Sequence, residues 1–192
     1  GTDISALPVD MEPKGLGFLS RMFDTVAYGA EEGRKQEKVA ATSDALLVDG
    51  KKYHIRGVTF STAAKGQDRR DVVLSLSAAG GEGVIKMMAD NGINTVRTYN
   101  PPEDSLLDAF ARNNIRVIVG FPRHDDRYSL GADIAGGDYA EYIRSHKDHP
   151  AILAWELGNE YNHDMYRQWF TLAQWWRELK DATAAIKAID QD

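Results

Sequence analysis

The feature that most constrains the fold is a regular alternation of short apolar runs and amphipathic segments from Leu46 onward. Runs of strand length centre on Val58, Val96, Val117 and Leu153, and a helical pattern fills each gap between them. Strands that are joined through helices run parallel, because each crossover returns the chain to the same end of the sheet. The alternation therefore predicts an α/β fold with a parallel sheet.

The expected elements follow from these patterns. A hairpin at residues 46–55, with Asp49 and Gly50 as its turn, leads into the first long strand. Strands are expected at residues 58–60, 94–99, 115–121 and 152–157. Helices are expected at residues 83–91, from Pro101 onward, at 139–145 and at 166–189. The second helix is predicted to direct four apolar side chains inward, namely Leu106, Leu107, Phe110 and Ala111.

Two architectures fit this order, an open doubly wound sheet and a closed (β/α)8 TIM barrel. A dinucleotide-binding open sheet would carry Gly-x-Gly-x-x-Gly after its first strand, and no such run follows Val58. The barrel is therefore favoured, and the chain supplies roughly its first four βα units, because a whole barrel needs about 250 residues. The chain is then either a fragment of a longer protein or a half barrel that a second copy completes. Four strands alone would leave two unpaired edges and an uncovered inner face.

Residues 1–44 differ from the half barrel expected at residues 45–192, and they are interpreted as an N-terminal extension or linker. Leu19, Met22, Phe23 and Val26 recur at helical spacing and predict one short amphipathic helix, which a highly charged stretch at residues 31–38 follows. A helix that lies on a membrane surface is the alternative, although only two basic residues, Lys14 and Arg21, flank the apolar face.

Composition limits the classes of partner and cofactor that the chain could bind. The net charge of −6, without basic clusters in the barrel region, argues against nucleic acid, because phosphate binding needs concentrated Lys and Arg. No apolar stretch approaches the roughly 20 residues of a membrane span, and no signal peptide is recognisable. The absence of cysteine excludes disulfides and Cys-ligated metals. His146 and His149 could suit a metal on a helix, but they fall at a helix-to-strand junction before Pro150, so we expect neither a metal nor a cofactor.

Polar residues that suit catalysis follow two of the expected strands. The apolar run at 151–155 leads into Gly158-Asn159-Glu160, and Arg97 lies near the end of the second strand. The carboxyl ends of parallel strands are where barrel proteins carry their chemistry. Two structural alternatives stay open: Asn159 and Glu160 as caps of the following helix, and Arg97 as a partner in an ordinary salt bridge.

Three segments in the correct order resemble clan A glycoside hydrolases, the retaining (β/α)8 enzymes that include the family 2, family 5 and glucanosyltransferase-like proteins. His149-Pro150-Ala151-Ile152 through Trp155, with Asn159-Glu160, is similar to their fourth barrel strand. Residues 48–58 are similar to the hairpin before their first strand, and residues 91–99 to their second strand. The resemblance spans residues 46–192.

The resemblance implies a retaining β-glycoside hydrolase or transglycosylase acting on a β-linked oligo- or polysaccharide. Such enzymes use two carboxyl groups about 5 Å apart. Glu160 would be the acid/base, with its pKa raised by partial burial and a nearby carboxylate, and Asn159 would bond the sugar's 2-hydroxyl. Arg97 would keep the nucleophilic carboxylate ionised. The substrate-binding candidates, which could stack on sugars or donate hydrogen bonds, are Tyr99, Phe121, His124, Tyr161 and Trp169.

The nucleophile of the clan is a glutamate at the end of strand seven, which four units do not include. Glu156 is a weaker acid candidate, Glu178 lies mid-helix and is a poor substitute, and Asp125-Asp126 reads as a solvated loop pair. The isolated chain is therefore expected to be inactive, with the missing half barrel or a second copy as its partner. The family alone suggests a periplasmic or secreted protein. The alternative function is a noncatalytic carbohydrate-binding or assembly module built from a half barrel.

Overall fold

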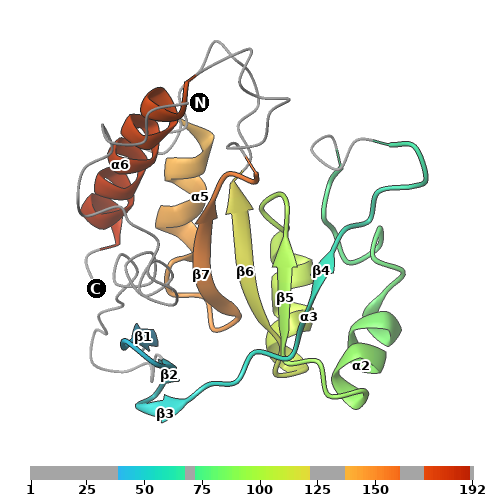
Figure 1. Ribbon diagram of the computed structural model, residues 1–192. Coiled ribbons are helices and arrows are strands. Elements are labelled where there is room, and N and C mark those ends of the chain that lie inside the picture. Colours follow the sequence, from blue (N-terminus) through green and yellow to red (C-terminus); the bar gives the residue numbers. More distant parts are fainter. Residues whose placement is uncertain (1–38, 68–71, 122–136, 161–170, 191–192) are drawn as a thin grey trace, which may run out of the picture.

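A parallel sheet forms the centre of the molecule (Figure 1). The computed structural model describes residues 39–67, 72–121, 137–160 and 171–190. The sheet order is β4-β5-β6-β7, with every neighbouring pair parallel, as the sequence predicts. Its strands are Gly57–Phe60 (β4), Thr95–Thr98 (β5), Arg116–Phe121 (β6) and Ile152–Leu157 (β7). Because the strands lie side by side in chain order, this is the arrangement of the first four strands of a (β/α)8 barrel.

Helices alternate with these strands along the chain. They are Glu82–Asp90 (α2), Asp104–Arg112 (α3), Asp138–His146 (α5) and Leu172–Ile189 (α6). In Figure 1, α2 lies near β4 at one end of the sheet, and α5 and α6 lie together at the β7 end. The α/β fold with alternating strands and helices is therefore confirmed. Within the described residues, no helix combines the length and the apolar character that a bilayer crossing requires.

Local sequence sets two helix starts that differ from the expected ones. At α6, the Thr171 hydroxyl accepts the Gln174 N–H at 3.2 Å, and the Gln174 side chain accepts the Thr171 N–H at 2.7 Å. This capping box begins the described helix at Leu172. At α3, the helix begins after the proline pair rather than at Pro101, and Glu103 is its extended N-cap. Prolines disfavour helical geometry in the residue before them, which delays the start.

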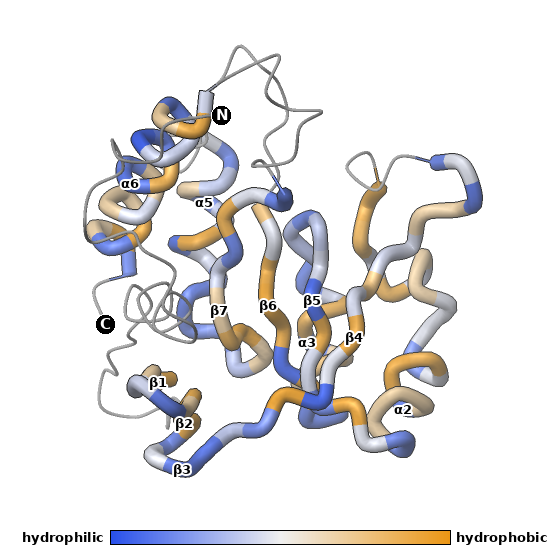
Figure 2. The backbone as a smooth tube through the Cα atoms, viewed as in Figure 1, coloured by the Kyte–Doolittle hydropathy of each residue, from blue (hydrophilic) through white to orange (hydrophobic). Residues whose placement is uncertain are grey.

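The hydrophobic core lies between the sheet and its helices. Successive residues of a strand point to opposite faces, so one set of side chains faces the helices. That set is almost fully buried and includes Val96, Val117, Val119, Phe121 and Trp155. Leu106, Leu107 and Phe110 of α3 are fully buried against it, as predicted, whereas Ala111 is only partly buried at the margin. Figure 2 shows β6 as hydrophobic along most of its length and α6 as mixed, as expected of a helix with one face on the core.

A small antiparallel sheet precedes the parallel one. It contains Val39–Ala41 (β1), Leu46–Val48 (β2) and Lys51–Lys52 (β3), in that order. The turn between β2 and β3 has positive φ at both Asp49 (51°) and Gly50 (72°), which suits a two-residue hairpin loop. The predicted turn is thus present, but the second strand ends at Lys52 rather than at Ile55.

The chain from Tyr53 onward attaches the small sheet to the parallel one. The Tyr53 hydroxyl donates to the backbone oxygen of Asn94 at 2.8 Å, and the Arg56 N–H donates to the Asn94 side chain at 2.8 Å. Strand β1 was not predicted, because three small residues carry too little pattern to distinguish a strand from a linker. The helix expected at residues 19–26 and the charged stretch at 31–38 lie outside the described residues.

Candidate active site

The carboxyl ends of β5 and β7 bring the predicted polar residues to one edge of the sheet. Arg97 lies on β5, and Asn159 and Glu160 follow β7 closely. Arg97 is level with Ile118 of β6, and Gly120 of β6 is level with Glu156 of β7. Residues at the same level, or two apart, share a face of a sheet. Arg97, Gly120 and Glu156 therefore lie on the face opposite the helices, which is the inner face of a barrel.

Arg97 forms the central contact of this edge. Its Nε donates to Glu156 Oε2 and its Nη2 to Glu156 Oε1, both at 2.5 Å. Nη2 also donates to Asn159 Oδ1 at 2.7 Å. The Arg97 and Glu156 side chains are 24% and 23% exposed, so solvent screens the pair only in part. The hydrogen bonds that Arg97 donates to Glu156 raise the pKa of Arg97 in spite of its partial burial, so Arg97 remains cationic.

Gly120 leaves room for the backbone that follows β5. Strand β6 separates β5 from β7, so Arg97 and Glu156 must meet across it. A side chain at Gly120 would begin in overlap with the backbone oxygen of Thr98 and at 3.2 Å from the Tyr99 backbone. The missing side chain at this level therefore allows the close approach of β5, from which Arg97 reaches over β6 to Glu156.

Tyr99, a predicted substrate-binding residue, lies against Arg97. The guanidinium carbon is 4.6 Å from the centre of the Tyr99 ring, within the range of a cation–π contact. The ring face that Arg97 covers is not available to stack on a sugar. Tyr99 thus belongs to the same cluster as Arg97.

Glu160, the predicted acid/base, lies in a strained turn. Its φ of 56° is left-handed, as is that of Gly158 at 77°. For a residue other than glycine this conformation costs roughly 1–2 kcal/mol, and such strain gathers at functional sites. The Glu160 side chain is exposed. The described residues therefore do not supply the partial burial that was expected for Glu160.

Two residues have roles that differ from the expected ones. Phe121 ends β6, but its side chain points to the helices and is fully buried, with its ring 4.7 Å from that of Tyr139 and 5.6 Å from that of Trp155. Phe121 is therefore a core residue and does not face the side of the sheet on which Arg97 and Glu156 lie. Glu156, expected as a weaker acid candidate, is instead the partner of Arg97.

The ordinary salt bridge considered for Arg97 thus exists, and Arg97 also holds Asn159. The sequence feature that could have identified Glu156 as a partner of Arg97 is its position as the single charge in an otherwise apolar strand. A carboxylate in such a run needs a partner. Three further substrate-binding candidates lie outside the described residues, namely His124, Tyr161 and Trp169. The loop pair Asp125-Asp126 also lies outside them.

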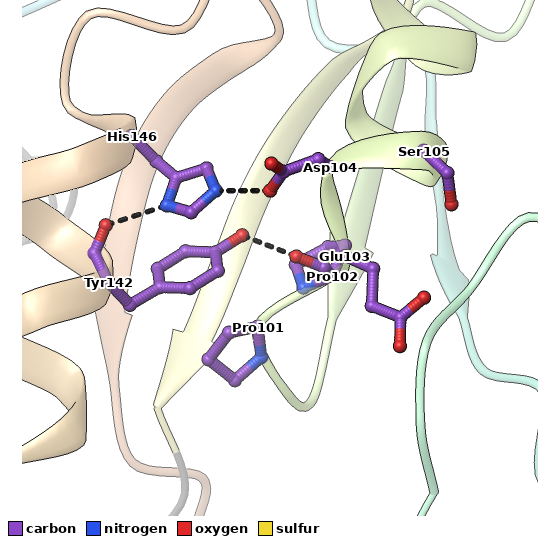
Figure 3. Close-up of a pocket in the computed structure, with 7 residues that line it drawn as sticks. All are labelled: Pro101, Pro102, Glu103, Asp104, Ser105, Tyr142 and His146. Atoms are coloured by element: carbon purple, nitrogen blue, oxygen red, sulfur yellow. Dashed lines mark hydrogen bonds and ion pairs between the residues drawn. The ribbon is translucent and has the colours of Figure 1, made fainter.

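His146 and His149 both contact carboxylates of α3. In Figure 3, the His146 ring bonds Asp104 Oδ1 at 2.7 Å, and the Tyr142 hydroxyl donates to the Pro102 oxygen at 2.7 Å. These residues line a shallow, open depression of about 520 Å³ between the start of α3 and the end of α5. His149 contacts Asp108 of α3 at 3.3 Å. Within the described residues, no group of three or more His, Cys, Asp or Glu could hold a metal ion.

Comparison with known proteins gives a structural similarity but no sequence match. No protein-family model and no curated protein matches the sequence. Among solved structures, the chain is similar to a glycosyl hydrolase family 2 member from Bacteroides cellulosilyticus DSM 14838, with a TM-score of 0.49 and 20% sequence identity. The similarity covers 76% of this chain and 18% of that chain, so this chain spans less than a fifth of the other protein's length.

Proposed function

We propose that this chain forms the acid/base half of a retaining β-glycoside hydrolase or transglycosylase that acts on β-linked oligo- or polysaccharides. The observation that carries the proposal is the Arg97 guanidinium, which holds Asn159 next to Glu160 at the carboxyl edge of a parallel sheet. That edge is where (β/α)8 enzymes carry their catalytic residues. The sequence resemblance of residues 46–192 to clan A enzymes supports the same assignment.

In the proposed reaction, Glu160 gives its proton to the glycosidic oxygen while a carboxylate attacks the anomeric carbon. The bond from that carbon to the leaving oxygen breaks, and a covalent glycosyl-enzyme forms. Glu160, now ionised, takes a proton from water or from an acceptor hydroxyl, whose oxygen displaces the carboxylate. The attacking carboxylate is assigned to a strand that this half barrel does not include.

The test uses the natural protein in which this chain occurs, with aryl β-glycosides as substrates. Glu160→Ala should slow cleavage strongly for poor leaving groups and far less for activated ones, because only the former need protonation. Azide should then accelerate turnover, since it attacks the glycosyl-enzyme without a general base. Glu141→Ala on the exposed side of α5 is the matched control and should keep wild-type rates. Wild-type rates for Glu160→Ala on a natural oligosaccharide would remove its assigned role.

The 192-residue chain by itself should show no turnover of these glycosides, because one carboxylate without its partner cannot run a double displacement. Full activity of the isolated chain would contradict a nucleophile on a later strand.

A noncatalytic carbohydrate-binding or assembly module is the second candidate, and the exposure of Glu160 favours it, since the acid of a retaining glycosidase is expected in a partly buried position. Calorimetric binding of β-linked oligosaccharides by the natural protein, without cleavage of any of them, would select this function. Under either candidate function, we predict a periplasmic or secreted location. We also predict that this half barrel pairs with a second copy or with a C-terminal half barrel.

A further inference from the structure

The two ends of the Asn159 amide differ chemically, and Arg97 distinguishes them. A guanidinium has donors only, so the Asn159 atom at 2.7 Å from Arg97 Nη2 must be the oxygen. The amide nitrogen is then the end of Asn159 that Arg97 does not use. A ligand that meets this nitrogen must offer an acceptor, such as the oxygen of a sugar hydroxyl.

Arg97 alone is a weak support for Asn159. Its side chain is long and rotates freely, and a single hydrogen bond leaves the plane of the guanidinium undefined. Glu156 removes this freedom, because two parallel bonds at 2.5 Å match the fork of the guanidinium to the carboxylate. Tyr99 covers one face of the guanidinium, at 4.6 Å. Glu156 therefore decides where the third donated bond, the one to Asn159, can point.

We propose that Glu156 is a positioning residue, which through Arg97 turns the amide nitrogen of Asn159 toward a ligand hydroxyl. This deepens the proposed function and rests on it for the identity of the ligand as a sugar. Glu156 does not transfer a proton in this proposal, because both of its oxygens already accept bonds from Arg97.

The first arm of the test needs no activity. In the 192-residue chain, the Arg97 Nε–H signal in NMR should be protected from exchange with water. Glu156→Gln should speed that exchange by about tenfold or more and shift the Asn159 side-chain amide signals, with the remaining spectrum unchanged. Glu82→Gln is the matched control, because Glu82 pairs with Arg112 at 3.0 Å on the exposed surface of α2 and α3. Unchanged Asn159 signals in Glu156→Gln would overturn the proposal.

The second arm measures kcat/KM in the natural protein for a β-glycoside and its 2-deoxy analogue. Glu156→Gln should lower kcat/KM for the full sugar by about tenfold, as expected for one misplaced hydrogen bond, equally for good and poor leaving groups. On the 2-deoxy substrate the same change should cause little further loss, because the coupled hydroxyl is absent. A purely structural role predicts equal losses on both sugars.

The outcomes separate the two proposals. A defect of Glu156→Gln that grows with poor leaving groups and is rescued by azide would make Glu156 the acid and overturn the positioning role. Coupled NMR changes in the 192-residue chain, together with a natural protein that cleaves no β-glycoside, would support the positioning role and reject the proposed function.

Discussion

Gly120 has the backbone of a neighbouring strand at the place where a side chain would begin. Gly120→Ala should lower the free energy of unfolding by about 1–3 kcal/mol, because backbone cannot move aside as a flexible side chain can. Urea denaturation measures the change. Gly83→Ala on α2 is the control: nothing lies within 4 Å of the added methyl, and loss of unfolded-state freedom should raise stability by about 0.4–1 kcal/mol. Equal stability of Gly120→Ala and wild type would contradict the crowding.

Glu160 has a backbone conformation that glycine adopts more easily. Glu160→Gly should therefore raise the free energy of unfolding, by up to about 1 kcal/mol, although it removes the proposed acid/base. Glu141→Gly within α5 should lower stability by about 0.5–1 kcal/mol, since a helix interior disfavours glycine. Thermal denaturation of both variants checks the sign. A loss of stability in Glu160→Gly would mean that its side chain holds the turn in place.

Single residues differ in how far the sequence alone could place them. Arg97, Asn159 and Glu160 could be assigned to one edge because each lies at or just after the end of an apolar run in a parallel sheet. Phe121 and Glu156 could not, because their roles depend on which face each side chain takes. That face follows from the register of β6 with β7, including the shift between Val117 and Ile118. No local pattern encodes such a shift.

The secondary-structure elements were more predictable than their ends. Strand β7 has the bounds that its apolar run predicts, and the four long strands pair in the predicted order. Periodicity determines these features, because burial repeats every two or every 3.6 residues. The ends depend on individual bonds instead, such as the one between Thr171 and Gln174 that begins α6. Hydrophobic periodicity does not record a single local bond of this kind.

The bond between Asp104 of α3 and His146 of α5 should make the free energy of unfolding depend on pH. The bond from His146 lowers the pKa of Asp104 from its usual 3.8, so folding favours the ionised carboxylate. The contribution of the ionised Asp104 carboxylate to the free energy of unfolding is therefore present above the unfolded pKa. It is lost as the pH falls through the lowered pKa of the folded state. Because the Asp104 side chain is 85% exposed, the contribution is below about 1 kcal/mol.

Asp104→Asn should thus be slightly less stable than wild type at pH 7, and the difference should shrink as the pH falls from about 5 to below 3.8. Urea unfolding of both proteins across this range tests it. Glu103→Gln is the control, since the Glu103 side chain does not face His146 in Figure 3. A difference that grows toward acid would reverse the assigned sign.

For the molecule as a whole, the sheet ends at β4 within the described residues. Val58 of β4 is 41% exposed and Ile55 before it is 45% exposed, so apolar surface lies beside a strand edge. Such an edge favours pairing with another chain. The isolated chain should therefore self-associate as its concentration rises, which sedimentation velocity can measure.

Val58→Lys should reduce this self-association, because a charge on an edge strand opposes pairing. Met87→Lys is the matched control: Met87 is 57% exposed but lies on α2, so its replacement should leave association unchanged. A wild-type chain that stays monomeric at every concentration would show that β4 is not an association edge.

The contact of Arg97 with Glu156 joins two strands that are not neighbours, and it can form in only one alignment of β5, β6 and β7. A slip of one residue in β7 would turn Glu156 toward the helices, where the core is apolar. The misaligned chain would then bury a carboxylate without its partner, at a cost of several kcal/mol. The contact that orders the candidate active site therefore also disfavours incorrect strand pairing, so the correctly folded chain and the assembled site arise together.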